Sequence, residues 1–305
     1  MRYMISNFFR QMIIVARYEL ADAVRSKRAA LTIILYVAGA IVAMNGFINV
    51  LKRLESQLVK TLGINIVDSA GVVTDSLWRS VHFRNMMIGL VGDKELAIDL
   101  LNIPPIALMY GWLAFTFTPM LVILTASPRI ADEIATGSVR YVIQRCSRAA
   151  WSLGKFTGQV GLVILGLTLS AITAWTTVRF RLNVMDTWAT SRAFIIFAAK
   201  AWIYSFTFVG LATGVSHLSR TANQATIFGF LAWFILSVIN IAAKFNAGEG
   251  IRMIWYLVEI VLPEGHRMNL WSLDPLSVIC ASSFVITLGL CYWSAGYMYF
   301  RNRDL

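Results

Sequence analysis

The sequence predicts an all-α integral membrane protein. Hydrophobic residues make up 58% of the 305 residues and charged residues only 14%, whereas soluble domains carry about a quarter charged residues. Six apolar runs reach the roughly 20 residues that a helix needs to cross a bilayer. Because unpaired backbone groups cannot face lipid, and the alternating pattern of a membrane barrel is absent, we expect each run to be a helix.

The six predicted spans are separated by polar segments of unequal length. We expect one transmembrane domain over residues 1–305, without a separate soluble domain. The predicted spans cover residues 29–51, 103–126, 156–178, 193–216, 224–243 and 276–300.

The placement of Lys and Arg predicts the orientation of the chain. An even number of spans puts both termini on one side of the membrane. Lys and Arg are denser in the segments on that side than in those on the other, and cytoplasmic loops carry this excess. We therefore expect both termini to be cytoplasmic, and we attribute the net charge of +11 to this bias and to anionic lipid, not to nucleic acid.

Three segments outside the spans carry secondary structure of their own. Residues 1–28 show apolar side chains at helical spacing, which predicts an amphipathic helix at the cytoplasmic interface, either a simple membrane anchor or an elbow that also touches a partner. Residues 52–102 form a long extracytoplasmic segment with a helical piece near 75–88. Residues 244–275 form an extracytoplasmic hairpin. In the predicted helix of residues 1–28, the polar residues Arg10, Arg17, Glu19 and Arg25 fall mostly away from the apolar side.

The extracytoplasmic hairpin contains an apolar stretch that is too short to cross a bilayer. Residues 251–262 number only 12, so they predict a short re-entrant or interfacial helix. Pro263 and Gly265 are expected to stop it.

No pattern for catalysis, metal binding or nucleotide binding emerges. Gly154-Lys155 lacks the earlier glycine of a phosphate loop, because position 149 is Ala. The three histidines lack Cys or carboxylate partners at metal-ligand spacing, so we expect them to be polar surface residues. They are His82, His217 and His266. We predict no catalytic residue, no metal and no cofactor bound by this chain.

The spans contain few polar residues with a candidate role. Asp and Glu are absent from the six runs, although ion-coupled transporters usually keep a carboxylate there. Lys200 in span four either snorkels to the interface or contacts an anionic substrate or lipid. Asn45 and Asn49 share one face of span one, for inter-helix hydrogen bonds or for a substrate path. Gly210 and Gly214 permit close helix packing.

The polar interruption at residues 127–155 is the most informative part of the chain. Asp132 and Glu133 suit the start of a new helix, where negative charge is favourable. Thr136-Gly137-Ser138 predicts a bend in which Ser138 caps the next helix. Residues 139–143 then form a short helix that Ser147-Arg148 ends.

This order of motifs resembles type-2 ATP-binding-cassette (ABC) exporter permeases. Members of that family carry a Glu, a Gly-Thr or similar pair, an apolar stretch, a Ser-Arg and a Gly-Lys before the third span. This chain has Glu133, Gly137-Ser138, residues 139–143, Ser147-Arg148 and Gly154-Lys155 in that order. The departure is Ser138, where Thr is more usual. Residues 17–28 look like the family's elbow helix and residues 299–305 like its C-terminal ending.

The resemblance implies a half-transporter in a bacterial cytoplasmic membrane. Two permeases, identical or similar, would pair around a central path, with two separate ATPase subunits that bind ATP and Mg. Residues 137–148 would be the cytoplasmic coupling helix. The residues assigned to ATPase coupling are Glu133, Gly137, Ser138, Val139, Arg140, Tyr141, Arg145, Arg148 and Lys155.

The resemblance also bears on what is transported. It implies export of an amphipathic or hydrophobic substrate, and the segment 52–102 would suit an extracytoplasmic accessory protein. Three alternatives stay open: an ATP-independent channel or secondary transporter, a membrane-embedded enzyme of lipid chemistry, and a membrane component that serves extracytoplasmic enzyme maturation.

Overall fold

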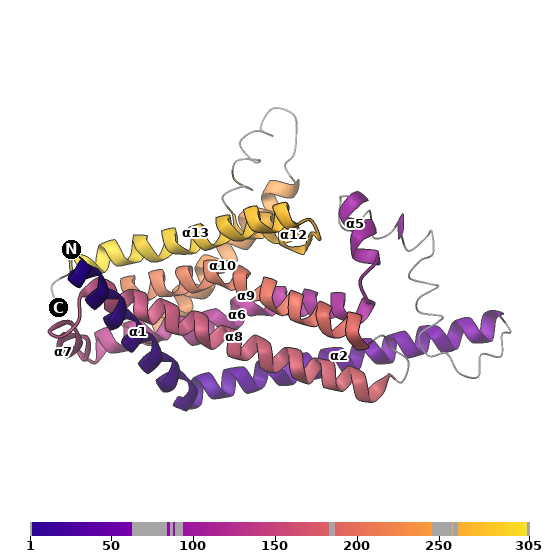
Figure 1. The fold of residues 1–305 in the computed structure, drawn as a ribbon, viewed down its shortest axis with the longest axis horizontal. Helices are drawn as coiled ribbons and strands as arrows, with labels where there is room; N and C mark the ends of the chain where they lie inside the picture. Colours follow the sequence, from indigo (N-terminus) through magenta and orange to yellow (C-terminus); the bar gives the residue numbers. More distant parts are fainter. Residues whose placement is uncertain are drawn as a thin grey trace.

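The structure is a computed structural model that describes residues 2–62, 84–85, 88, 94–182, 187–245, 258 and 262–303. Within these ranges every regular element is a helix (Figure 1). The elements are α1 (Arg2–Arg25), α2 (Lys27–Leu62), α5 (Lys94–Leu101), α6 (Pro105–Ala135), α7 (Val139–Ile143), α8 (Arg148–Arg181), α9 (Thr187–Leu218), α10 (Ala222–Phe245), η1 (Pro263–His266), α12 (Arg267–Trp271) and α13 (Pro275–Arg301).

Six of these helices are long and apolar enough to cross a bilayer. This confirms the predicted fold class, an all-α membrane protein with six spans. The spanning segments are Lys27–Arg53, Pro105–Ala135, Arg148–Arg181, Thr187–Leu218, Ala222–Ala243 and Pro275–Arg301.

The second span extends well beyond its predicted end at residue 126. α6 continues through Pro128 to Ala135, because helices of membrane proteins tolerate proline where neighbouring helices satisfy the freed backbone groups. Asp132 and Glu133 therefore lie in the last turn of α6. The prediction that they begin a new helix is wrong.

α9 lies in the middle of the bundle and packs against α6, α8, α10 and α13. Its side chains join a large aromatic core. Tyr110 stacks on Phe194 with ring centroids 4.7 Å apart, and Phe115 lies 5.2 Å from Tyr204. Such aromatic contacts add to the burial of apolar area.

Glycines bring α9 and α13 into close contact. A Cβ atom at Gly210 would lie 1.9 Å from the carbonyl oxygen of Gly289, and one at Gly214 would lie 2.5 Å from that of Tyr292. The reverse holds at Gly296, where a Cβ would lie 2.3 Å from the Gly214 oxygen. Only small residues allow helix backbones to approach this closely.

α1 meets α2 in a sharp bend at Ser26 and crosses the N-terminal part of α8 (Figure 1). Two glycines of α8 make this crossing close, since a Cβ at Gly154 would lie 2.6 Å from Val15 and one at Gly158 would lie 2.7 Å from Glu19. Glu19 is only 1% exposed. Its assignment to the polar outer side of the helix is therefore wrong.

In the hairpin between α10 and α13 the structure describes residue 258 and the residues from 262 onward, so the predicted helix at 251–262 lies mostly outside the described residues. Pro263 and Gly265, which were expected to stop it, lie in η1. Pro263 opens η1, in the first-turn position that proline favours. Glu264 accepts from Ser237 and from Asn240 of α10, both at 2.7 Å. A carboxylate thus reaches side chains of a span, although it comes from outside the span in the sequence. The predicted helical piece at 75–88 lies mostly outside the described residues.

Candidate functional site

Both termini and α7 lie at the same end of the bundle (Figure 1). The helices that meet there are α1, the last turn of α6 and the first turns of α8. The polar segment 127–155 is distributed over α6, α7 and α8. It is therefore the end of one span, a short helix and the beginning of the next span.

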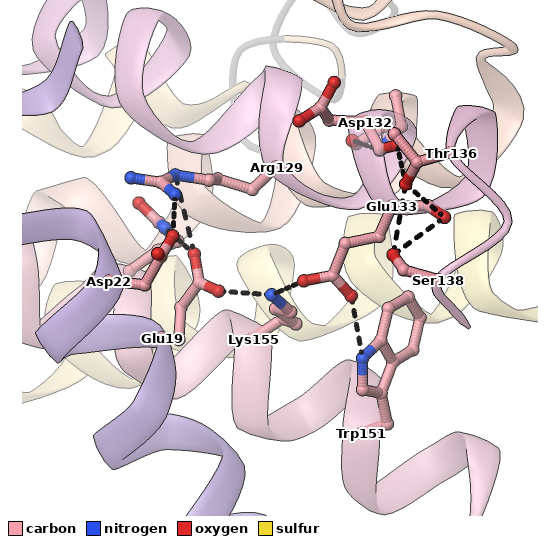
Figure 2. Close-up of polar contacts among 12 residues, drawn as sticks. Glu19, Asp22, Arg129, Asp132, Glu133, Thr136, Ser138, Trp151 and Lys155 are labelled. Atoms are coloured by element: carbon pink, nitrogen blue, oxygen red, sulfur yellow. Dashed lines mark hydrogen bonds and ion pairs between the residues drawn. The ribbon is translucent and has the colours of Figure 1, made fainter. Parts of the chain in front are cut away.

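Lys155 of α8 joins two carboxylates from different helices. Its Nζ donates to Glu19 of α1 on one side and to Glu133 of α6 on the other (Figure 2). The side chain of Lys155 is 9% exposed, that of Glu19 is fully buried, and that of Glu133 is 29% exposed. One lysine therefore fixes the positions of α1 and α6 relative to α8.

Three further polar side chains complete the ionic network. Arg129 of α6 donates to Asp22 of α1 at 2.5 Å and lies 3.7 Å from Glu19 (Figure 2). Gln159 of α8 donates to Glu19 at 2.5 Å. Buried carboxylates are tolerated only when they are paired and hydrogen-bonded, and Glu19 has three such partners.

Glu133 also orders the start of the α7 segment. Its carboxylate accepts from the indole of Trp151 at 3.2 Å, and its backbone carbonyl accepts from Ser138 at 3.3 Å (Figure 2). Gly137 has φ +70°, a left-handed conformation that favours glycine. The predicted bend is present and Ser138 occupies the N-cap position of α7, but its side chain makes no capping bond.

α7 has one buried side and one exposed side. Val139 is 1% exposed and belongs to an apolar cluster with Ile130, Trp151 and Phe300. The opposite side is cationic and aromatic, and Tyr141 at its centre is 76% exposed. The exposed side chains are Arg140, Tyr141, Gln144 and Arg145.

Ser147 and Arg148 begin α8 and do not belong to α7. The Ser147 hydroxyl accepts from the Ala150 N–H as the N-cap of α8. Arg148 donates to the carbonyls of Arg301 at 2.9 Å and Arg303 at 3.1 Å. A cation at these carbonyls suits the C-terminal end of a helix dipole, so Arg148 ties α8 to α13.

A cavity of about 790 Å³ lies between α1 and α7. Glu19, Glu133 and Lys155 line its inner part, and Tyr18 and Tyr141 line it farther out. Burial raises the pKa of the Cys146 thiol, which also lines the cavity, so this thiol stays protonated at neutral pH.

Two of the polar residues singled out within the spans, Asn45 and Lys200, donate to backbone carbonyls. Asn45 donates to the carbonyl of Ile41 in its own helix at 3.0 Å, and Asn49 is exposed. Lys200 donates to the carbonyl of Ser272 at 2.7 Å and is only 9% exposed. Ser272 lies in the connection between α12 and α13, so the ammonium group of Lys200 ties α9 to this connection.

Several residues of the site could not be recognised in the sequence. Glu19 is one of several charges on an amphipathic helix, and Trp151 resembles an interfacial tryptophan. His217 is fully buried, which contradicts the prediction of a surface histidine. The spacing of Gly154 and Gly158, four residues apart, is a signal in the sequence from which close packing of α8 could have been predicted.

Among the described residues, no group of His, Cys, Asp or Glu could hold a metal ion. α7 presents an exposed cationic face, and the ionic network joins α6 and α8, the helices on either side of α7, to each other and to α1.

These features define a multi-pass α-helical membrane protein with an anchored surface helix between its second and third spans. The family profile described as "ABC-2 family transporter protein" matches residues 13–249. The chain therefore belongs to the ABC-2 family and is a transmembrane permease of an ABC transporter. Membership implies ABC ATPase subunits as partners. A comparison with curated proteins found no match.

Proposed function

We propose that this permease exports an amphipathic or hydrophobic substrate, driven by ATP that a separate ATPase subunit hydrolyses. The exposed face of α7 carries the proposal. Arg140, Tyr141 and Arg145 project from a five-residue helix whose flanking helices are fixed by Lys155 and Arg148. A short rigid helix whose cations have no ion-pair partner within the described part of the chain suits a groove on a partner that has acidic and apolar groups.

The transporter would contain two permease copies and two ATPase subunits, with ATP and Mg bound by the ATPase. Both termini and α7 would face the cytoplasm of a bacterium, because the ATPase is a soluble partner. An extracytoplasmic accessory protein would bind near residues 52–102.

A membrane-facing groove supports the proposed substrate class. It has a volume of about 620 Å³ and lies between α2 and α6, with Ser170 of α8 at its inner side. Its walls include Tyr36, Trp112 and Phe117, and none of its described lining residues carries a charge. Apolar walls with a few hydroxyl groups suit a neutral or weakly polar hydrocarbon ligand.

The test uses the tagged permease purified from membranes that also contain its ATPase. We expect ATP hydrolysis to co-purify with the wild-type chain and to be lost with Arg145→Glu and Tyr141→Ala. Arg179→Glu is the matched control, because Arg179 is an exposed arginine near the opposite end of α8.

Transport is measured in vesicles as ATP-dependent movement of a fluorescent phosphatidylcholine. If no ATPase activity accompanies the wild-type chain, or if both α7 variants retain it, the proposal fails. Movement of the lipid without ATP would instead indicate an ATP-independent transporter.

A further inference from the structure

Two neighbouring residues in the last turn of α9 reach in different directions across the bundle. Ser216 and His217 are both fully buried. Ser216 contacts α6, and His217 contacts α8. These are the two helices that flank α7, so the end of α9 touches both sides of the segment that we assign to coupling.

The Ser216 hydroxyl stands between two backbone groups of α6. It accepts from the N–H of Ala131 at 2.9 Å and donates to the carbonyl of Ser127 at 2.5 Å. Residues 127 and 131 are four apart, so in a regular helix these two groups bond to each other. A side chain that inserts at this place in a helix is a recognised cause of bending.

Proline weakens α6 at the same point. Pro128 lies between the two bonded residues and supplies no backbone N–H. α6 therefore lacks one backbone hydrogen bond at Pro128, and the N–H of Ala131 donates to the Ser216 hydroxyl of α9. The part of α6 after Pro128 carries Arg129 and Glu133 and leads through Gly137 to α7.

His217 connects α9 to α8 and α13 through a chain of hydrogen bonds. Its Nδ1 lies 2.6 Å from the carbonyl of Thr213, and its Nε2 lies 2.8 Å from the hydroxyl of Ser152. Trp293 of α13 donates to that hydroxyl at 2.8 Å. In a neutral imidazole Nδ1 then donates to Thr213 and Nε2 accepts from Ser152. The imidazole of His217, the hydroxyl of Ser152 and the indole N–H of Trp293 are thus all hydrogen-bonded.

We propose that the pair Ser216-His217 is the junction through which movement of α7 reaches the centre of the bundle, with Ser216 as a positioning residue for the end of α6. Ser216 acts through Ala131 and Ser127, and it sets the position of Glu133 and α7 relative to α9. The inference rests on the proposed function, because it assumes that α7 receives the movement of an ATPase.

The chain offers a matched control in the same turn. Ser219, the residue after the end of α9, is 1% exposed, and its hydroxyl donates to the carbonyl of Val215 of α9 at 2.9 Å. Ser219→Ala and Ser216→Ala thus remove the same atoms from equally buried sites. Only Ser216→Ala removes a contact with α6.

The first experiment uses the full chain alone in lipid nanodiscs. Spin labels are placed at Tyr141 and Leu218, which are 76% and 50% exposed, in a chain whose three cysteines are replaced by serine. We expect Ser216→Ala to broaden the distance distribution, and Ser219→Ala and Ser216→Thr to leave it as in the parent chain. Equal distributions for Ser216→Ala and Ser219→Ala would overturn the proposal. If Ser216→Ala does not fold, Ser216→Val replaces it and is compared with Ser216→Thr, because valine and threonine have nearly the same shape and differ in the hydroxyl.

The second experiment uses the complex with its ATPase and the fluorescent phosphatidylcholine. We expect Ser216→Ala to lower the ratio of lipid moved to ATP hydrolysed by about fivefold, the factor that corresponds to one hydrogen bond, while hydrolysis persists. Ser219→Ala keeps the ratio, and Ser216→Thr restores it. An unchanged ratio in Ser216→Ala refutes the junction. If the wild-type complex moves no lipid with ATP, the proposed function fails, and the spin-label distances still decide the role of Ser216.

Discussion

Arg148, the first residue of α8, donates to the backbone carbonyl of Arg301, the last residue of α13, at 2.9 Å. The same guanidinium lies 5.9 Å from the centre of the Phe300 ring. The contact joins the helix that follows α7 to the last span. It gives Arg148 a structural role in addition to the ATPase contact that the resemblance implied.

Replacement of Arg148 by alanine is expected to destabilise the permease by about 1–2 kcal/mol, because the last carbonyls of α13 lose a cation. Thermal unfolding in detergent measures the effect. Arg145→Ala is the control, since Arg145 is exposed on α7, and it should lower ATPase binding without lowering the unfolding temperature. If the two variants unfold at the same temperature, the role of Arg148 as a cap is wrong.

Lys155→Met is expected to be much more harmful to stability than Glu133→Gln. Removal of the lysine leaves the buried Glu19 with one distant cation, and an uncompensated buried charge costs about 3–5 kcal/mol. Glu133→Gln leaves Lys155 paired with Glu19, and the partly exposed site of Glu133 admits water, so no buried charge is left without a partner. Unfolding by heat in detergent measures both variants, and equal costs would contradict the network described in Figure 2.

Gly210→Ala is expected to destabilise the bundle by about 1–3 kcal/mol, the usual cost of overpacking a core. The new Cβ would overlap the Gly289 carbonyl, so α9 and α13 would have to separate. Gly39→Ala is the matched control, because nothing lies within 4 Å of a Cβ there. It should be neutral or stabilising, since alanine favours helices more than glycine does. The comparison fails if both alanines have the same effect on the unfolding temperature.

Asp274 is expected to make stability depend on pH at acid values. Its carboxylate accepts from the hydroxyl and N–H of Ser277 and from the N–H of Leu276 at the start of α13, and these bonds lower its pKa. Because the folded pKa lies below the unfolded value of about 3.9, the contribution is fully present above that value. It is lost as the pH falls through the folded pKa. The difference in unfolding temperature between wild type and Asp274→Ala should therefore shrink in acid. A difference that stays constant would show that the charge of Asp274 does not matter.

Predictions from residue type and spacing succeeded where one physical rule was sufficient. Long apolar runs have no alternative to helix in a membrane, so the number of spans follows from the sequence. The bend at Gly137 follows from the same local reasoning. The second span was predicted to end at residue 126, close to Pro128, because proline normally ends a helix. In the structure α6 continues to Ala135, and the hydroxyl of Ser216, 85 residues from Ala131 in the sequence, bonds to its backbone there.

The sequence by itself determined the class of protein, the six spans, the position of the α7 segment and the absence of a recognisable phosphate loop. These properties depend on hydropathy and on short-range geometry. The tertiary structure alone decided that Glu19 and Glu133 share Lys155, that Arg148 holds α13, and that Ser216 and His217 lie between the helices that flank α7. The physical reason is that a buried charge or hydroxyl is stable only when a partner binds it. Each of these partners lies on another helix, so short-range sequence patterns do not reveal it.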